Sequence, residues 1–391
     1  MYSQERKTFQ DKHSMFVNQE REENSNMKKR ILSMILATAM VATVLVGCGA
    51  KEEAAAPAEA PAVEEAAPAE EAPAAEEAPA EEAAAPAEDG GLIKVGFAQV
   101  GHESDWRTAN TQNYQDTFSE ANGYELVFVD CDNNHDVQIE SVRNSIQQEV
   151  DYIILAPIQA AGWDVPLQEA ADAGIPVIVA DRQVDADPSM YDAFIGTDCK
   201  VEGVTAGKWL EEYLNGEAAK ILVIEGTVGA SAAIGRSEGF NEVAANHPEW
   251  EILDSQSGNF TQEEGQQVME SFIKSYPEFD VVVCHNDNEA YGAMDAMKAA
   301  GITYGTDGDV IIISFDATHD GLQYTLDGDI HCNVECNPIQ AAYVDDIIKK
   351  MEAGEEFPEY TLVEDQAFVA PGIESSLAIT MTQEVLDGRL Y

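Results

Sequence analysis

Short apolar runs alternate with longer segments of helical spacing from residue 92 onward, and this alternation limits the fold more than any other feature of the chain. Runs such as Tyr152–Ala156 and Val281–Cys284 are apolar at almost every position, which is typical of strands that helices cover on both faces of a sheet. Strands of this kind in alternation with helices predict an α/β protein with buried parallel sheets.

Ten strands and nine helices are predicted from this pattern. The strands are Ile93–Gln99, Glu125–Val129, Tyr152–Ala156, Val177–Ala180, Ala193–Ile195, Lys220–Ile224, Glu251–Ser255, Val281–Cys284, Val310–Phe315 and Ile330–Glu335. The helices are Thr108–Ala121, Gln138–Glu149, Val165–Ala173, Glu202–Leu214, Ser237–His247, Glu263–Tyr276, Ala290–Ala300, Gly321–Leu326 and Ile339–Glu352. The strands divide into two sheets of about five, with a break near residue 198, and the chain from 91 onward is long enough for two domains.

The N-terminal segment has the order of a secretory signal: the basic patch Lys28-Lys29-Arg30, then the apolar run Ile31–Val46, then small residues. The ending Leu45-Val46-Gly47-Cys48 resembles a bacterial lipobox, which implies that Cys48 becomes the lipidated first residue and anchors the protein to the cell membrane. A transmembrane anchor is the alternative, although the run has 16 residues and a spanning helix needs about 20. Because Met27 precedes the basic patch, we expect the true start at residue 27 of this 1–48 leader.

Residues 51–90 consist almost wholly of Ala, Glu and Pro and contain no aromatic residue. Repeated prolines interrupt helices, like charges extend the chain, and there is almost nothing to bury. We therefore predict a disordered tether over residues 49–90, which could span roughly 130 Å when fully extended.

The folded part is strongly acidic, because residues 91–391 contain 13 basic and 55 acidic residues. A surface of this charge repels phosphate backbones, so we exclude nucleic acid as a partner. A transcription regulator of similar core also needs an N-terminal DNA-binding helix pair, and the signal and tether occupy that place.

Five cysteines follow the leader: Cys131, Cys199, Cys284, Cys332 and Cys336. The number is odd and several lie within or beside apolar strands, so we expect reduced, small core residues. The pair Cys332 and Cys336, with His331 beside it, has a spacing that suggests a metal site. Positions four apart on a strand are about 13 Å from each other, however, so we predict no metal and no cofactor.

Polar and aromatic side chains follow the predicted strands, at the edge where open parallel sheets bind ligands. They are Trp106, Arg107, Asp181, Arg182, Arg236, Phe260, Asn286 and Asp316. Guanidinium groups suit vicinal hydroxyls, carboxylates or phosphates, the two aromatic rings could stack on a sugar, and the carboxylate and amide groups could bond hydroxyls. Together these groups predict a polyol site.

Each of these residues also has a purely structural interpretation. Asp181 and Arg182 could simply pair with neighbours, and Trp106 could belong to the core. The glycines Gly226 and Gly229 match neither the dinucleotide fingerprint nor a phosphate loop. An exported enzyme would need a nucleophile and base in a suitable arrangement, and the sequence offers none, so we predict no catalysis.

Several of the strand-end motifs together resemble the type I periplasmic binding proteins of sugar ABC importers, the ribose- and galactose-binding kind. The motifs are Asp181-Arg182-Gln183, the segment from Gly226 to Phe240, His285-Asn286-Asp287 and Ser314-Phe315-Asp316. The segments from Val95 to Arg107 and from Ser255 to Phe260 resemble the galactofuranose-binding members most. The similarity extends over residues 92–391.

The resemblance implies two Rossmann-like lobes with parallel sheets, joined by three hinge crossings, with a sugar bound in the cleft. It places residues 91–198 and 337–368 in an N-terminal lobe and residues 199–336 and 369–391 in a C-terminal lobe. It also implies ligand contacts for the eight strand-end residues, with Phe260 as the stacking ring. Ribose binders carry a Gln near Glu335-Cys336, so ribose is disfavoured and Glu335 is a further candidate contact. Glu103 is another, because its loop is one residue longer than in ribose binders.

The function that the resemblance implies is capture of a monosaccharide outside the cytoplasm and its delivery to an ABC transporter permease. The ligand is expected to be galactofuranose or a related hexose, and the protein a lipid-anchored monomer without enzymatic activity. A receptor of the same fold that presents ligand to a chemoreceptor or sensor kinase is the alternative.

Overall fold

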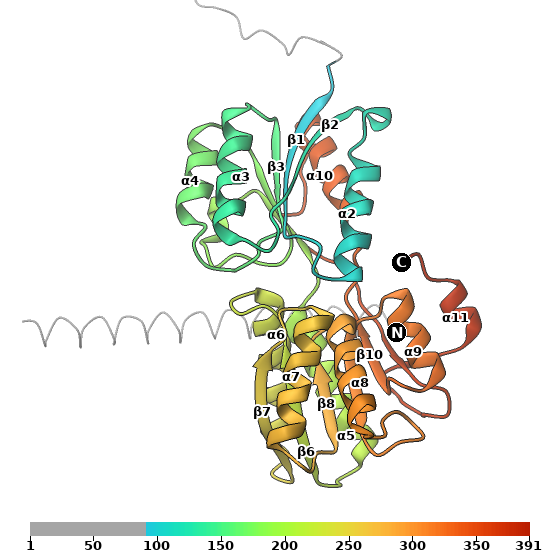
Figure 1. Cartoon of the computed structure of the whole chain (residues 1–391). Coiled ribbons are helices and arrows are strands. Elements are labelled where there is room, and N and C mark those ends of the chain that lie inside the picture. The colour runs from blue at the N-terminus through green and yellow to red at the C-terminus, as the bar shows by residue number, and fades with distance from the viewer. Residues whose placement is uncertain (1–90) are drawn as a thin grey trace, which may run out of the picture. The chain divides into compact units, whose positions relative to one another are not determined.

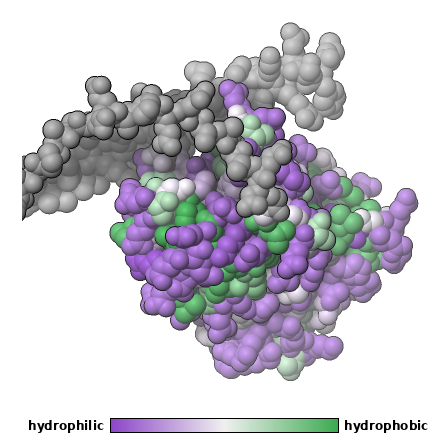
Figure 2. Space-filling view, turned by 90° about the horizontal axis from the view of Figure 1, so that it is seen from above, coloured by the Kyte–Doolittle hydropathy of each residue, from purple (hydrophilic) through white to green (hydrophobic). Residues whose placement is uncertain are grey.

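The computed structural model describes residues 91–391 (Figure 1). The predicted 1–48 leader, lipidation at Cys48 and the 49–90 tether lie outside the described residues. Within residues 91–391, no helix is both long enough and apolar enough to cross a membrane. Figure 2 shows that hydrophilic residues cover most of the visible face of the described part, as its acidic composition predicts.

The first sheet contains six parallel strands in the order β11-β5-β4-β3-β1-β2. Its strands are β1 (Ile93–Gln99), β2 (Tyr124–Asp130), β3 (Tyr152–Leu155), β4 (Val177–Asp181), β5 (Ala193–Gly196) and β11 (Tyr360–Leu362). Its helices are α2 (Asp105–Thr117), α3 (His135–Gln147), α4 (Asp164–Asp172) and α10 (Ala341–Ala353). Figure 1 shows α3 and α4 on one side of the strands and α2 and α10 on the other, so both faces of the sheet are buried. We call this unit the first lobe.

The second sheet contains seven strands in the order β13-β12-β10-β9-β8-β6-β7, and only the pair β10 and β12 is antiparallel. Its strands are β6 (Ala219–Glu225), β7 (Trp250–Ser257), β8 (Val281–Cys284), β9 (Ile311–Asp316), β10 (Cys332–Glu335), β12 (Ala367–Val369) and β13 (Ile379–Thr380). Its helices are α5 (Cys199–Leu214), α6 (Ser231–Ala244), α7 (Gln262–Ser275), α8 (Asp287–Ala300), α9 (His319–Asp327) and α11 (Gln383–Asp387). We call this unit the second lobe.

Alternating residues of β6 supply two separate cores in the second lobe, since successive strand side chains point to opposite faces. Ile221 and Val223 pack with residues of α5 and α6, whereas Leu222 and Ile224 pack with residues of α7 and α8. The parallel strands are therefore covered on both sides, which explains why the sequence shows apolar runs rather than alternation.

The chain passes between the lobes three times: between β5 and α5, between β10 and α10, and between β11 and β12. Because β12 begins at Ala367 and pairs with β10 of the second sheet, the last crossing comes before the predicted boundary at 368.

All ten predicted strands are present, and β1 and β8 have the predicted bounds. The prediction of about five strands a sheet was too low, because β11, β12 and β13 have only two or three residues and give no periodic signal. Helix α6 begins at Ser231, six residues before the predicted start at Ser237. The first turns of α6 consist of small residues, because α5 packs closely against them. A Cβ at Gly235, for example, would lie 3.0 Å from the Cys199 Cβ.

The five cysteines are free thiols, and four of them are buried as predicted, while Cys199 is half-buried. Burial raises the pKa of Cys332 and of Cys336, so both stay protonated near neutral pH. Among residues 91–391, no group of three or more His, Cys, Asp or Glu side chains is placed to hold a metal ion.

Candidate ligand-binding site

A small cavity lies where the carboxyl ends of the two sheets meet, and all eight predicted strand-end residues line it. The lining residues are Glu103, Ser104, Trp106, Arg107, Asp181, Arg182, Ala232, Arg236, Phe260, Asn286, Asp316 and Cys336. The structure thus brings Glu103 to the same place, whereas Glu335 is not part of the lining. The cavity has a volume of about 20 Å³, which is room for roughly one water molecule.

Three lining residues have the left-handed backbone conformation that non-glycine residues rarely adopt. The φ angles are 63° at Asp181, 94° at Asp316 and 62° at Phe260. Asp181 and Asp316 are the last residues of β4 and β9, and Phe260 follows β7. Such backbone conformations cost on the order of 1–3 kcal/mol each and cluster at functional sites, so their position marks this cavity.

Arg107 organises the first lobe's side of the cavity. Its Nη2 donates to Asp181 Oδ2 at 2.6 Å and its Nε donates to Glu103 Oε1 at 3.0 Å. Burial by itself lowers the pKa of Arg107, but the two carboxylates outweigh this effect and raise it. The guanidinium also lies 4.6 Å from the centre of the Trp106 ring, whose Nε1 donates to the Cys336 carbonyl at 2.5 Å. Arg107 and Trp106 therefore hold the two carboxylates and the nearby crossing in place.

Arg182 and Glu103 have polar atoms that no described residue satisfies. Arg182 Nη2 donates to Glu103 Oε1 at 3.3 Å, while Arg182 Nη1 and Glu103 Oε2 are buried without a hydrogen-bond partner among the described residues. The Arg182 guanidinium lies 5.0 Å from the centre of the Phe260 ring, which belongs to the other lobe. Leaving buried polar atoms unpaired is costly, so this pair is suited to bond hydroxyl groups of a ligand.

The charge states of these two groups follow from their surroundings. Burial by itself raises the pKa of Glu103, but Arg107 and Arg182 outweigh it and lower the pKa, so the carboxylate is ionised. Burial, followed by repulsion from Arg107, lowers the pKa of Arg182. The cavity thus offers an ionised hydrogen-bond acceptor beside a cationic donor.

Arg236 organises the second lobe's side. Its Nε donates to Glu202 Oε2 at 2.7 Å, its Nη2 donates to Asp316 Oδ1 at 3.2 Å, and its Nη1 donates to the His285 carbonyl. Burial raises the pKa of Asp316 to about 8, against the opposing effect of Arg236, so the carboxyl is protonated at neutral pH and can donate a hydrogen bond. Gly203 permits this packing, because a Cβ there would lie 2.3 Å from the Arg236 carbonyl oxygen.

Glu202 is a site residue that the sequence prediction missed. It is 2 % exposed on α5, and its second oxygen accepts from the Thr197 hydroxyl at 2.7 Å. Helical spacing places Glu202 on the same face as the buried Ala206 and Leu210, and this pattern could have shown that its carboxylate needs a buried cation.

Asn286 uses its side chain within the protein. Its Oδ1 accepts from the Glu289 N–H at 2.8 Å and caps α8, and its Nδ2 donates to the Phe260 carbonyl at 3.0 Å. The structure therefore gives Asn286 a role in positioning the Phe260 loop, beside the predicted ligand contact.

Glu335 faces the C-terminal residues instead of the cavity. Its carboxylate accepts from Arg389 Nη2 and from the Tyr391 hydroxyl, both at 2.5 Å, and from the Gln366 N–H at 3.0 Å. The adjacent Cys336 lines the cavity in its place.

Direct hydrogen bonds join the lobes on either side of the cavity. On one side, the Asp105 N–H donates to Asn288 Oδ1 at 3.0 Å, and Asn288 Nδ2 donates to Asp105 Oδ2 at 3.2 Å. We call this reciprocal pair the latch. On the other side, the Gln183 N–H donates to Ser231 Oγ at 2.8 Å, and the Ala160 N–H donates to the Gly229 carbonyl at 2.9 Å.

Two α/β lobes, three chain crossings and a polar cavity at the facing strand ends define a two-lobed solute-binding protein. The chain belongs to the periplasmic binding protein domain family, whose model matches residues 95–345, and the predicted fold class is confirmed. Membership of this family implies a location outside the cytoplasm.

The chain is similar to several sugar-binding proteins, and three of them are described with furanose sugars. The galactofuranose-binding protein YtfQ of Escherichia coli K12 is 39% identical over 271 residues, which cover 68% of this chain and 84% of YtfQ. A Mycobacterium smegmatis structure in complex with β-D-fucofuranose is 45% identical, covers 71% of this chain and 91% of its own, and has a TM-score of 0.69. The arabinose-transporter binding component of Shewanella sp. ANA-3, bound to L-arabinofuranose, is 37% identical with the same coverage and a TM-score of 0.67. The predicted resemblance to sugar-binding members of this family is confirmed.

Proposed function

We propose that this protein captures a monosaccharide in its furanose form, galactofuranose or a related hexose, and delivers it to the permease of an ABC transporter. The observation that carries the proposal is the pair of buried polar atoms on Glu103 and Arg182 that have no partner among the described residues, together with the Phe260 ring beside the Arg182 guanidinium. The furanoses named for three relatives of 37–45% identity support it.

Capture proceeds by closure of the lobes. A sugar ring needs far more room than the cavity's volume of about 20 Å³, so the lobes must separate to admit it. Glu103 and Arg182 come from the first lobe, whereas Asp316 and Phe260 come from the second, so the full set of contacts forms only when the lobes meet. The hydroxyl groups bond the polar side chains, and the apolar face of the ring lies on Phe260.

Calorimetric titration with galactofuranose, galactopyranose, ribose, arabinose and a nucleoside tests the ligand assignment. We expect micromolar or tighter binding of one furanose. Arg182→Ala removes hydrogen bonds to a charged group, which are worth about 1.5–3 kcal/mol, and should weaken binding roughly 10- to 100-fold. The matched control is Arg143→Ala, because Arg143 pairs with Glu169 on the surface. No binding across the panel would refute the assignment.

Delivery and anchoring need separate experiments. The sugar-loaded protein should stimulate ATP hydrolysis by its reconstituted permease, whereas stimulation of a sensor kinase instead would establish the receptor function. Cys48→Ser should move the protein from the membrane to the soluble fraction and abolish incorporation of a labelled fatty acid. Unchanged labelling would refute lipidation at Cys48.

A further inference from the structure

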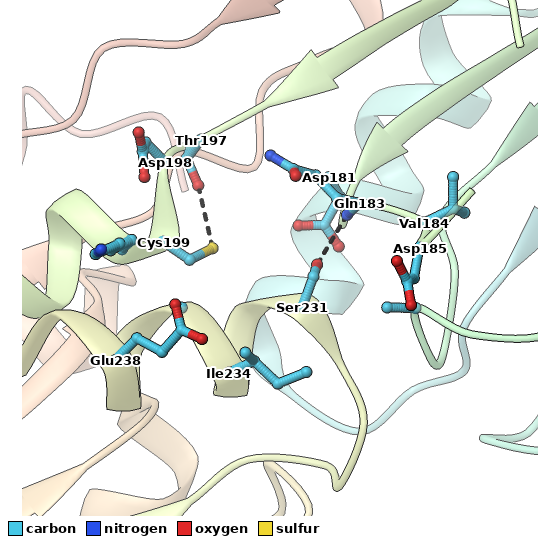
Figure 3. Close-up of a pocket in the computed structure, with 13 residues that line it drawn as sticks. Asp181, Gln183, Val184, Asp185, Thr197, Asp198, Cys199, Ser231, Ile234 and Glu238 are labelled. Atoms are coloured by element: carbon cyan, nitrogen blue, oxygen red, sulfur yellow. Dashed lines mark hydrogen bonds between the residues drawn. The ribbon is translucent and has the colours of Figure 1, made fainter. Parts of the chain in front are cut away.

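A second and much larger cavity lies beside the ligand-binding site (Figure 3). Its volume of about 330 Å³ is within the range of small-molecule sites. Gln183 and Asp185 of the first lobe, the crossing at Thr197, and Ser231 and Glu238 of α6 form its walls. Like the ligand-binding site, it is therefore lined by residues of both lobes.

The two cavities share their walls. Asp181 lines both of them. On α6, Ser231, Ile234 and Glu238 line the large cavity, whereas Ala232 and Arg236 line the small one, so adjacent faces of one helix serve both. The two spaces therefore adjoin at Asp181 and along α6.

The polar groups of the large cavity are mainly hydrogen-bond acceptors. Asp181, Asp185, Asp198 and Glu238 contribute carboxylates, which accept from hydroxyl groups, whereas Lys200 contributes a cation that pairs with Glu242 outside the lining. This excess of carboxylates disfavours phosphate and carboxylate ligands. Ile234 adds apolar surface against which a ring can pack. A neutral, hydroxyl-rich ring has the properties that this wall selects.

We propose that the large cavity is a second sugar subsite, so that the natural ligand class includes a furanose linked to a second sugar ring. This inference rests on the proposed function and extends it. The furanose binds among the residues that line the small cavity, which widens to hold it, the link passes Asp181, and the second ring lies between α6 and the Gln183 loop. Closure of the lobes then buries both rings.

Calorimetry with the purified protein tests the subsite. The probes are galactofuranose, a galactofuranosyl disaccharide, and the corresponding arabinofuranose pair. Because the second ring adds several hydrogen bonds, we expect a disaccharide to bind at least about tenfold more tightly than its monosaccharide. Ile234→Trp fills the large cavity and should remove this gain while leaving monosaccharide affinity within about twofold. Glu238→Gln keeps the size but removes an acceptor charge and should weaken only the disaccharide. Val165→Trp is the matched control, since Val165 is exposed on α4 and lines neither cavity.

The outcomes separate the two proposals. If the monosaccharide binds and the disaccharide binds no better, or Ile234→Trp weakens both equally, the subsite is refuted and the proposed function stands. If only the disaccharide binds, the subsite is supported and the monosaccharide assignment is refuted. If neither sugar binds, both proposals are overturned.

Discussion

The latch between the lobes predicts that Asn288→Ala weakens ligand binding without weakening the fold. Asn288 lies on α8 of the second lobe, and Asp105 is the first residue of α2 in the first lobe. The first N–H groups of a helix have no partner within the helix, so Asn288 Oδ1 satisfies one of them from the opposite lobe. The bond from Asn288 Nδ2 to Asp105 Oδ2 completes the pair.

The magnitude follows from the two hydrogen bonds that the alanine removes. A net contribution of about 0.5–1.5 kcal/mol for each gives roughly 1–3 kcal/mol in favour of the closed arrangement. In the open protein these groups bond water, so the whole loss falls on closure. Each 1.4 kcal/mol is a factor of about ten in affinity, so Asn288→Ala should raise Kd roughly 5- to 150-fold.

Titration calorimetry and stopped-flow dissociation measure the effect, and urea unfolding measures stability. The lobes close after the ligand has first bound to the open protein, so the loss of affinity in Asn288→Ala should appear mainly as faster dissociation of the ligand. The free energy of unfolding should change by less than about 0.5 kcal/mol, because each lobe keeps its own core. Asn246→Ala is the matched control, since Asn246 donates only within its own lobe, to the Glu242 carbonyl.

Two results would contradict this reasoning. One is wild-type affinity and dissociation rate in Asn288→Ala. The other is a loss of stability as large as the loss of binding energy. Asn288→Asp should be worse than alanine, because it opposes two carboxylates, and adding Asp105→Asn should recover part of the affinity by restoring a donor and an acceptor.

Three further predictions concern the site. Arg236→Ala leaves the buried Glu202 carboxylate without its cation and removes the hydrogen bond from Arg236 to Asp316, so it should lower the free energy of unfolding by about 3–5 kcal/mol; urea unfolding measures this change, and a loss below about 1 kcal/mol would contradict the pairing. Since burial raises the pKa of Asp316 to about 8, the folded state keeps a proton that the unfolded chain releases near pH 4, and wild-type stability should fall between about pH 4 and 8. Asp316→Asn should lack the part of this fall that Asp316 contributes, whereas Asp287 and Asp365, whose pKa values burial raises to about 6 and about 9, contribute in both proteins. If the free energy of unfolding in urea changes equally between pH 5 and pH 8 for wild type and variant, this prediction is wrong. A Cβ at Gly226 would lie 1.9 Å from Phe260 Cζ, so Gly226→Ala should displace the ring from Arg182 and weaken sugar binding about tenfold or more, while circular dichroism stays unchanged; wild-type affinity would argue against the stacking role.

Apolar runs and turn residues were sufficient to predict the two parallel sheets and the edge on which the site lies. A strand such as Val281–Cys284 is buried on both faces, and a continuous apolar run is enough to indicate such a strand without knowledge of the elements that cover it. The carboxyl ends of parallel strands share one edge, and this rule assembled Asp181, Asn286 and Asp316 from distant parts of the chain before any contact was known.

Contacts between segments that are distant in sequence decided the short strands and the partners of individual side chains. The short strands β11, β12 and β13 exist only because longer strands offer them an edge, and a segment of two or three residues has no period of its own. Glu335 was a candidate contact because ribose binders carry a Gln near this position, but its carboxylate accepts hydrogen bonds from Arg389 and Tyr391. No local pattern could show this pairing, because those partners lie at the other end of the second lobe's sequence.

The sequence by itself thus determined the α/β class, the two-sheet organisation and the residue types at the strand ends, since burial and backbone geometry act locally along the chain. Only the tertiary structure decided which of those side chains are satisfied by protein and which remain free for a ligand. Glu202 satisfies Arg236, while the outer atoms of Glu103 and Arg182 have no described partner, and the latch and the second cavity exist only where two lobes meet. A hydrogen bond requires two groups to be close in space, whatever the number of residues between them in the sequence. The partners of these groups could therefore be identified only from the folded structure.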